Sequence, residues 1–247
     1  MSIYPVKGIK LGSTAAGIRY KDRDDLVVMQ CLPGTTAAGV FTRNRFCAAP
    51  VHVAKQHLSQ TTPRALVINA GNANAGTGEQ GMADAISSCE ALASRLDVST
   101  ETVLPFSTGV IGERLALDVL TKGLDNCIES ATDSADAWQR AASAIMTTDT
   151  VPKLVSSQVL LGGKTVTVTG IAKGAGMIRP DMATMLAFIA TDATIDSSLL
   201  QAARDAAVNA SCNRITVDGD TSTNDACMRL ATGASGMATG GEGGTVY

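Results

Sequence analysis

The segment from Lys173 to Asp192 constrains the fold more than any other part of the chain. It opens with Gly174 and Gly176 on either side of one alanine, and an Arg-Pro-Asp sequence that favours a turn follows. The apolar run over residues 185–190 predicts a buried strand. Thr184 stands where that run begins. A loop with unusual backbone freedom therefore places a threonine at the first position of a strand. A nucleophile at such a position can be held in one orientation and shielded from water.

The residues before this segment predict a β-hairpin. Residues 155–161 and 165–171 alternate between apolar and polar side chains, and two glycines separate them. Other expected strands cover residues 26–31, 37–42, 65–69, 103–106, 213–217 and 227–231, and expected helices cover 81–96, 115–128, 135–146 and 197–209. The segment 51–57 is ambiguous between helix and strand, and residues 107–112 are expected to form a turn of small residues.

The order of these elements predicts the fold class. Helices and strands alternate irregularly, and hairpins occur as well as crossovers. This favours an α/β layered sandwich, with helices outside two sheets, over a doubly wound parallel sheet. The chain has 247 residues, of which 45% are hydrophobic and 17% charged, so it is long enough and apolar enough to fold around a large core.

Charge and hydropathy argue against two classes of partner. The net charge is -3 without a basic block, which argues against nucleic acid. No apolar run approaches the roughly 20 residues that cross a bilayer, and no charged start followed by an apolar segment marks a secretory signal. We therefore expect a cytoplasmic protein with no membrane partner.

The cysteines and histidines are not arranged as metal ligands or as a catalytic pair in the sequence. The six cysteines form no C-x-x-C pair, and His52 and His57 are the two histidines, so no metal site of the usual spacing can be drawn. Both histidines are expected to have surface or packing roles, and the cysteines to act as small hydrophobes. The acceptor-rich residues 218–225 lack the spacing of a calcium loop. A catalytic base, if one is needed, is therefore expected not to be histidine.

Two long strings, Lys173–Asp192 and Asn213–Asp225, closely resemble the ornithine acetyltransferase family, the bifunctional glutamate N-acetyltransferases of arginine biosynthesis. A third, Asn69–Gly78, is similar to the Asn-Ala-Gly-x-Ala-Asn-Ala string of that family. The resemblance runs from roughly Gly8 to Gly233. A lone threonine at a strand start is ordinarily structural, but two long strings in the family's order are far more specific.

The resemblance implies self-cleavage. In this family the precursor cuts itself at an Ala-Thr bond, here Ala183–Thr184, to give segments 1–183 and 184–247 that share one core. The two pieces are expected to associate, as an α2β2 assembly. Thr184 would become an N-terminal nucleophile, and its α-amine, with a reference pKa of about 7.7–8.0, would serve as its base.

The resemblance also implies the site residues. Thr108 and Gly109 would form the oxyanion hole, a role for which a hydroxyl and a backbone N–H are suitable donors. Thr148, Lys173 and Thr184 would bind the substrate, and the Lys173 ammonium would pair with a substrate carboxylate. No metal is implied.

The implied reaction moves an acetyl group from N-acetylornithine to glutamate through an acetyl-threonine intermediate. It needs no cofactor, with acetyl-CoA as a further candidate donor. Two alternatives stay open: a self-cleaving amidase or aminopeptidase that passes the acyl group to water, and a shortened relative that is not processed and only binds. The family's Asp-Gly-Glu-Gly string has no secure counterpart, since Glu242 follows residues 231–233 too closely. We therefore expect this chain to cleave itself but to transfer acetyl groups poorly.

Overall fold

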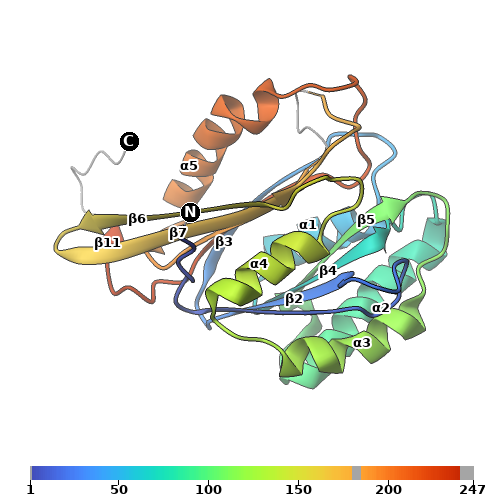
Figure 1. Cartoon of the computed structure of the whole chain (residues 1–247), viewed down its shortest axis with the longest axis horizontal. Coiled ribbons are helices and arrows are strands. Elements are labelled where there is room, and N and C mark those ends of the chain that lie inside the picture. Colours follow the sequence, from blue (N-terminus) through green and yellow to red (C-terminus); the bar gives the residue numbers. More distant parts are fainter. Residues whose placement is uncertain (1, 180–184, 240–247) are drawn as a thin grey trace.

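Two β-sheets face one another, and helices cover their outer faces, in a computed structural model that describes residues 2–179 and 185–239 (Figure 1). The first sheet has the strand order β1-β2-β4-β5 and the second has the order β3-β10-β8-β7-β6. The strands of the first sheet are β1 (Ile9–Thr14), β2 (Leu26–Cys31), β4 (Ala65–Asn72) and β5 (Val103–Val110). Those of the second are β3 (Thr36–Phe41), β6 (Lys153–Leu161), β7 (Lys164–Lys173), β8 (Leu186–Thr191) and β10 (Ala226–Ala231).

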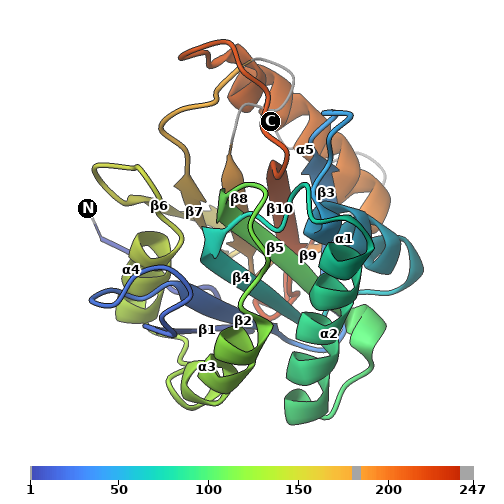
Figure 2. The ribbon, with the colours of Figure 1, turned by 90° about the vertical axis from the view of Figure 1, so that its right-hand side faces the viewer.

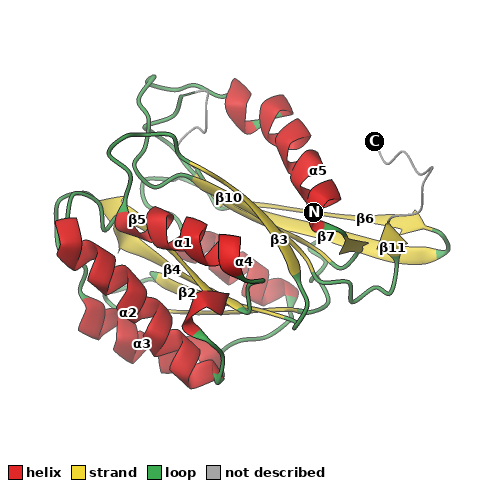
Figure 3. Cartoon of the chain, turned by 180° about the vertical axis from the view of Figure 1, so that it is seen from behind, coloured by secondary structure: helices red, strands yellow, loops and turns green. Residues whose placement is uncertain are grey.

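The helices complete the layers. Figures 2 and 3 show α2 and α3 on the outer face of the first sheet and α5 on the outer face of the second, while α1 and α4 close opposite sides of the sandwich. Their bounds are α1 (Ala49–Gln60), α2 (Gly78–Leu96), α3 (Leu117–Glu129), α4 (Ala135–Ala144) and α5 (Ser197–Ala210). Smaller elements are η1 (Thr100–Thr102), η2 (Cys212–Arg214), β9 (Thr194–Ile195) and β11 (Ala238–Thr239). The layered α/β sandwich expected from the sequence is confirmed.

The main core lies between the two sheets. Alternate side chains of facing strands meet there because successive residues of a strand point to opposite faces. Phe106 of β5 and Phe188 of β8 join the sheets, with ring centroids 5.0 Å apart in an edge-to-face arrangement. Trp138 of α4 is fully buried at the side of the same core.

The second sheet interleaves distant parts of the chain. Strand β10 pairs with β3 on one side and with β8 on the other, and β8 pairs with β7. The strands that follow residue 184 therefore lie between strands that precede residue 183. Separating the two segments would break two complete strand ladders, so they are joined by far more than the connecting peptide.

Several local predictions are confirmed and others are corrected. The hairpin of β6 and β7 turns at Gly162 and Gly163, whose φ values are +53° and +78°, as a primed two-residue turn requires. The ambiguous segment 51–57 is helical and belongs to α1, which has a proline in its first turn. In α5, Leu200 and Val208 are buried whereas Leu199 is 45% exposed.

Two strand boundaries are also corrected. Strands β4 and β5 pair in parallel from Ala65 and Val103 to Asn72 and Val110, so residues 107–110 belong to a strand and not to a turn. Each strand supplies the other with ladder hydrogen bonds, which overrides the weak strand propensity of the small residues. The strand predicted at residues 213–217 is wrong. Residues 212–214 form a 3-10 turn. Residues 215–217 are exposed and belong to no strand of the described chain.

Candidate active site

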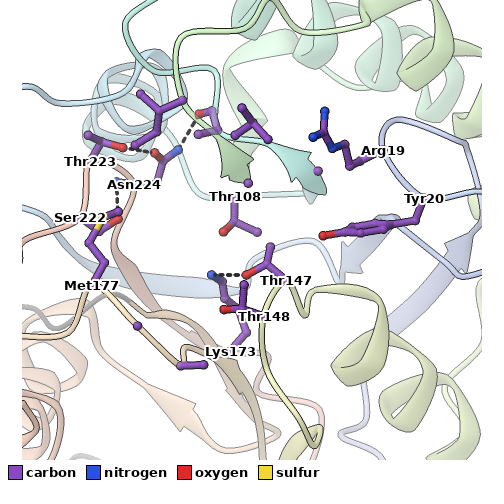
Figure 4. A pocket seen from close by; sticks show the side chains of 17 residues that line it. Arg19, Tyr20, Thr108, Thr147, Thr148, Lys173, Met177, Ser222, Thr223 and Asn224 are labelled. Atoms are coloured by element: carbon purple, nitrogen blue, oxygen red, sulfur yellow. Dashed lines mark hydrogen bonds between the residues drawn. The ribbon is translucent and has the colours of Figure 1, made fainter. Parts of the chain in front are cut away.

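A cavity of about 390 Å³ opens where the ends of both sheets meet (Figure 4). Its walls come from five regions that are far apart in the sequence: the loop after β1, the ends of β4 and β5, the turn before β6, the end of β7 with the glycine loop, and the turn before β10. The lining residues are Arg19, Tyr20, Gly71, Ala73, Thr108–Ile111, Thr147, Thr148, Lys173, Ala175–Met177 and Ser222–Asn224.

Thr108 and Gly109 lie at the end of β5, beside Ala70 and Gly71 of β4. Figure 4 shows the Thr108 side chain pointing into the cavity, on the side from which Thr147 and Lys173 enter. Gly109 has φ +136°, and a Cβ there would lie 2.3 Å from the carbonyl carbon of Gly71. Glycine is therefore required, and strand pairing holds this hydroxyl and backbone more rigidly than the expected turn would.

Lys173 ends β7 and is 6% exposed. Its Nζ donates a hydrogen bond to Oγ1 of Thr147, at 3.2 Å, and Thr148 lines the cavity next to that pair. Burial lowers the pKa of Lys173, while the carboxylates of Asp149 and Asp225 act in the opposite direction. The structure thus brings Thr108, Gly109, Thr148 and Lys173 to one cavity.

Asp149 organises the turn that precedes β6, a role that its place in a Thr-Thr-Asp-Thr string does not by itself indicate. Its carboxylate accepts from Nζ of Lys153, from the amide of Gly174 at 2.7 Å and from the amide of Thr147 at 3.3 Å. Burial alone would raise the pKa of Asp149, but these donors outweigh it and hold the pKa below its usual value. Asp149 therefore ties the turn of Thr147 to the glycine loop after Lys173.

The turn before β10 is tied to the first sheet. Nδ2 of Asn224 donates to the carbonyls of Ala73 at 2.6 Å and Ser107 at 2.9 Å. The next residue, Asp225, accepts a hydrogen bond from the amide of Met185, at 3.0 Å. Family resemblance singled out this string, but no residue in it was assigned a role.

Tyr20 and Arg19 are further lining residues that the sequence did not reveal. Figure 4 shows the Tyr20 ring entering the cavity with its hydroxyl directed toward Thr108 and Thr147. No motif surrounds these residues. Asp25 fixes their loop, because its carboxylate accepts from the amides of both Arg19 and Tyr20, at 3.1 and 3.4 Å.

The expected cleavage bond, Ala183–Thr184, lies outside the described residues. The chain on both sides of it is anchored by residues 211–225. The carboxylate of Asp218 accepts from the amides of Met177 and Ile178, at 2.6 and 2.9 Å, and Asp225 accepts from Met185.

Comparison with known proteins decides the family. The sequence pattern of the ArgJ family matches residues 10–244. The chain belongs to the ArgJ family. The arginine biosynthesis bifunctional protein ArgJ of Psychrobacter arcticus is 55% identical over 234 residues, which are 95% of this chain and 57% of that protein. The chain thus spans less than three fifths of the length of this ArgJ relative.

Two solved structures agree with this membership. The crystal structure of ArgJ from Bacillus halodurans has a TM-score of 0.67 and 35% identity, covering 73% of this chain and 92% of that one. The ornithine acetyltransferase from Mycobacterium tuberculosis, solved in complex with ornithine, has a TM-score of 0.63 and 35% identity, covering 74% and 94%. The family resemblance inferred from the sequence is confirmed.

Other sequence-based expectations concern groups outside the cavity. His57 is buried with Nδ1 2.8 Å from the carbonyl of Val103, and His52 is exposed, so both have the ordinary roles expected. Burial raises the pKa of Cys31, Cys89 and Cys127 to about 12, which makes these thiols poor nucleophiles. Across residues 2–179 and 185–239, no three His, Cys, Asp or Glu side chains are grouped as metal ligands. None of the described helices has the length and hydropathy to cross a membrane.

Proposed function

We propose that this chain is the part of an ArgJ acetyltransferase that carries the nucleophile and the oxyanion hole. The reaction moves an acetyl group from N-acetylornithine to glutamate after self-cleavage at Ala183–Thr184. One observation carries the proposal: Thr108, Gly109, Thr148 and Lys173 line a single cavity although up to 65 residues separate them in the sequence.

Self-cleavage prepares the nucleophile. Oγ1 of Thr184 attacks the carbonyl carbon of Ala183, the C–N bond between the two residues breaks, and water hydrolyses the resulting ester. Thr184 is left with a free α-amine, whose reference pKa of about 7.7–8.0 allows it to accept the hydroxyl proton at neutral pH.

Acetyl transfer then follows in two halves. Oγ1 of Thr184 attacks the acetyl carbonyl of N-acetylornithine, ornithine leaves with the proton, and the amine of glutamate takes the acetyl group from the threonine ester. The hydroxyl of Thr108 and the N–H of Gly109 stabilise the oxyanion in both halves. The buried ammonium of Lys173 pairs with a substrate carboxylate, an interaction that the dry surroundings strengthen.

The interleaved second sheet supports continued association of the pieces. Strands β8 and β10 would remain between β3 and β7 after cleavage, so segments 1–183 and 184–247 would share one core. An α2β2 assembly, a cytoplasmic location and the use of acetyl-CoA as a second donor stay predictions. The proposed reaction needs no cofactor.

The experiment supplies N-acetylornithine with isotopically labelled glutamate to this chain and to a form extended to the full length of its relatives. Labelled N-acetylglutamate is expected from the extended form, with Thr184→Ala inactive in both. Release of acetate without N-acetylglutamate would favour the amidase alternative. Turnover that survives Thr184→Ala would overturn the proposal.

A further inference from the structure

The Tyr20 side chain lines the cavity and has no role in the reaction as derived so far. Its ring enters from the loop between β1 and β2, and Figure 4 shows its hydroxyl directed toward Thr108 and Thr147. That hydroxyl has no hydrogen-bond partner among residues 2–179 and 185–239. A phenol can both donate and accept a hydrogen bond. Tyr20 therefore offers the cavity a polar group that the surrounding fold does not use.

The loop that carries Tyr20 is held firmly by a buried carboxylate. Asp25 is fully buried, and its carboxylate accepts hydrogen bonds from four backbone amides of this loop. The donors are the amides of Ala16, Gly17, Arg19 and Tyr20, at 2.9, 3.2, 3.1 and 3.4 Å. Hydrogen bonds to an ionised acceptor are about twice as strong as neutral ones. The backbone of Tyr20 is thus fixed before any substrate binds.

Arg23 fixes the ring in turn. Cζ of its guanidinium lies 3.7 Å from the centroid of the Tyr20 ring, which is a cation–π contact. Its Nη2 donates a hydrogen bond to the carbonyl of Met146, at 2.6 Å. Met146 directly precedes Thr147 and Thr148. Arg23 therefore ties the Tyr20 ring to the turn that supplies two further residues of the cavity.

The proposed function determines which part of a substrate would face this hydroxyl. The acetyl carbonyl lies against Thr108 and Gly109, and the α-carboxylate pairs with Lys173, whose Nζ donates to Thr147. In an N-acetyl α-amino acid, the amide N–H is the one polar group between the acetyl carbonyl and the α-carboxylate. Because the Tyr20 hydroxyl is directed toward Thr108 and Thr147, it faces the position of this N–H.

We propose that the hydroxyl oxygen of Tyr20 accepts a hydrogen bond from the substrate nitrogen that gives up or takes the acetyl group. N-acetylornithine presents its amide N–H to this oxygen, and glutamate presents its α-amine at the same place in the second half of the reaction. Arg23 acts as a positioning residue that holds the ring. The proposal rests on the proposed function and adds a substrate contact to it. Tyr20 thereby favours donors that carry the acetyl group on nitrogen over donors that carry it on oxygen.

The test compares an amide donor with its ester counterpart, in the form of the protein extended to the full length of its relatives. N-acetylglutamate and 2-acetoxyglutarate have the same acetyl group and the same two carboxylates, but the ester has an oxygen in place of the N–H. N-acetylglutamate serves as a donor because each half of the transfer is reversible. Each donor is supplied with isotopically labelled glutamate, and kcat/KM for the donor is measured from labelled N-acetylglutamate. In a two-step transfer this constant reports on the donor half alone.

Tyr20→Phe keeps the ring and its contact with Arg23 and removes only the hydroxyl. It should lower kcat/KM for N-acetylglutamate by about five- to tenfold, the loss expected for one hydrogen bond, and change that for 2-acetoxyglutarate by no more than about twofold. Arg23→Met should lower the constant for the amide donor alone by at least about threefold, because the ring loses its cation. Tyr4→Phe is the matched control, since Tyr4 is 38% exposed and lines no part of the cavity, and it should change neither constant.

The other outcomes contradict one proposal or both. An equal loss with both donors in Tyr20→Phe would mean that the residue acts through the shape of the cavity, and would overturn the role of its hydroxyl. An unchanged constant for N-acetylglutamate would overturn it too. If Tyr20→Phe does not fold, the same ratio of the two constants in Arg23→Met and in the wild type contradicts the proposal. A wild-type full-length form that acetylates labelled glutamate from neither donor contradicts the proposed function itself, and this role of Tyr20 with it.

Discussion

Replacing Thr108 with alanine removes the side-chain donor of the proposed oxyanion hole. The residue is 6% exposed and points into the cavity from a strand that is paired along its whole length. Its hydroxyl has no hydrogen-bond partner among the residues that the structure describes. Removing it therefore leaves no other buried group without a partner, and the cost should fall on catalysis and not on folding.

The expected loss of activity follows from the role of the hydroxyl as an oxyanion donor. One donor aimed at a developing oxyanion in a desolvated site contributes about 2.7–4 kcal/mol, so Thr108→Ala should lower kcat for acetyl transfer by about 10²–10³. The change in unfolding free energy should stay below about 1 kcal/mol, the range of strand propensities measured in host proteins. Thr108→Ser keeps the hydroxyl and should retain activity within about tenfold of the wild type.

The assay measures acetylation of Thr184 in a single turnover with excess N-acetylornithine, after cleavage is complete, by the intact mass of the smaller piece. Unfolding in urea is measured in parallel. Near-normal acetylation by Thr108→Ala would refute the reasoning. An equal loss in Thr108→Ser would do so too, because the cause would then be the methyl group and its packing.

Further substitutions have defined outcomes. Gly109→Ala would place a Cβ 2.3 Å from the carbonyl carbon of Gly71 at a left-handed φ, and should lower the free energy of unfolding in urea by at least about 2 kcal/mol. Gly34→Ala is its control, because Gly34 also has a positive φ, of +84°, but open space around it. It should cost about 1 kcal/mol. Lys173→Met should raise KM for the carboxylate substrates by about 30-fold or more, in a steady-state assay of the full-length form. Trp138→Ala should destabilise the fold by about 3–5 kcal/mol in urea unfolding, because the side chain is fully buried. Burial raises the pKa of Asp225 to about 7, so between about pH 4 and 7 the folded state keeps a proton that the unfolded state has lost. The free energy of unfolding therefore falls as the pH rises through this range. In thermal melting, Asp225→Asn should be more stable than the wild type at pH 8 but not at pH 4.

Local sequence signals predicted the parts of the fold that depend on neighbours in the chain. The hairpin of β6 and β7 follows from alternation around Gly162 and Gly163, and the layered architecture follows from the mixture of hairpins and crossovers. The strand character of residues 107–110 did not follow, because β4 stabilises it from a distance. The position of β8 and β10 between β3 and β7 likewise depends on the pairing of β10 with β3, which lies more than 100 residues earlier in the sequence.

Some residues of the candidate site could be predicted from the sequence, and others were revealed only by the structure. Thr108, Gly109, Thr148 and Lys173 were found through strings that resemble a family, and the structure adds that they share one cavity. Tyr20 and Asp225 gave no such signal as individual residues. Tyr20 lines the cavity and Asp225 accepts from the Met185 amide, and both contacts join segments that are far apart in the sequence. Such contacts cannot be read from local residue patterns.

Cleavage between Ala183 and Thr184 is the central claim, and intact mass with N-terminal sequencing of the purified chain tests it most directly. We expect two pieces that stay associated under native conditions, the smaller beginning at Thr184, and a Thr184→Ala variant that remains whole. A wild-type chain that stays in one piece after prolonged incubation at neutral pH would contradict it.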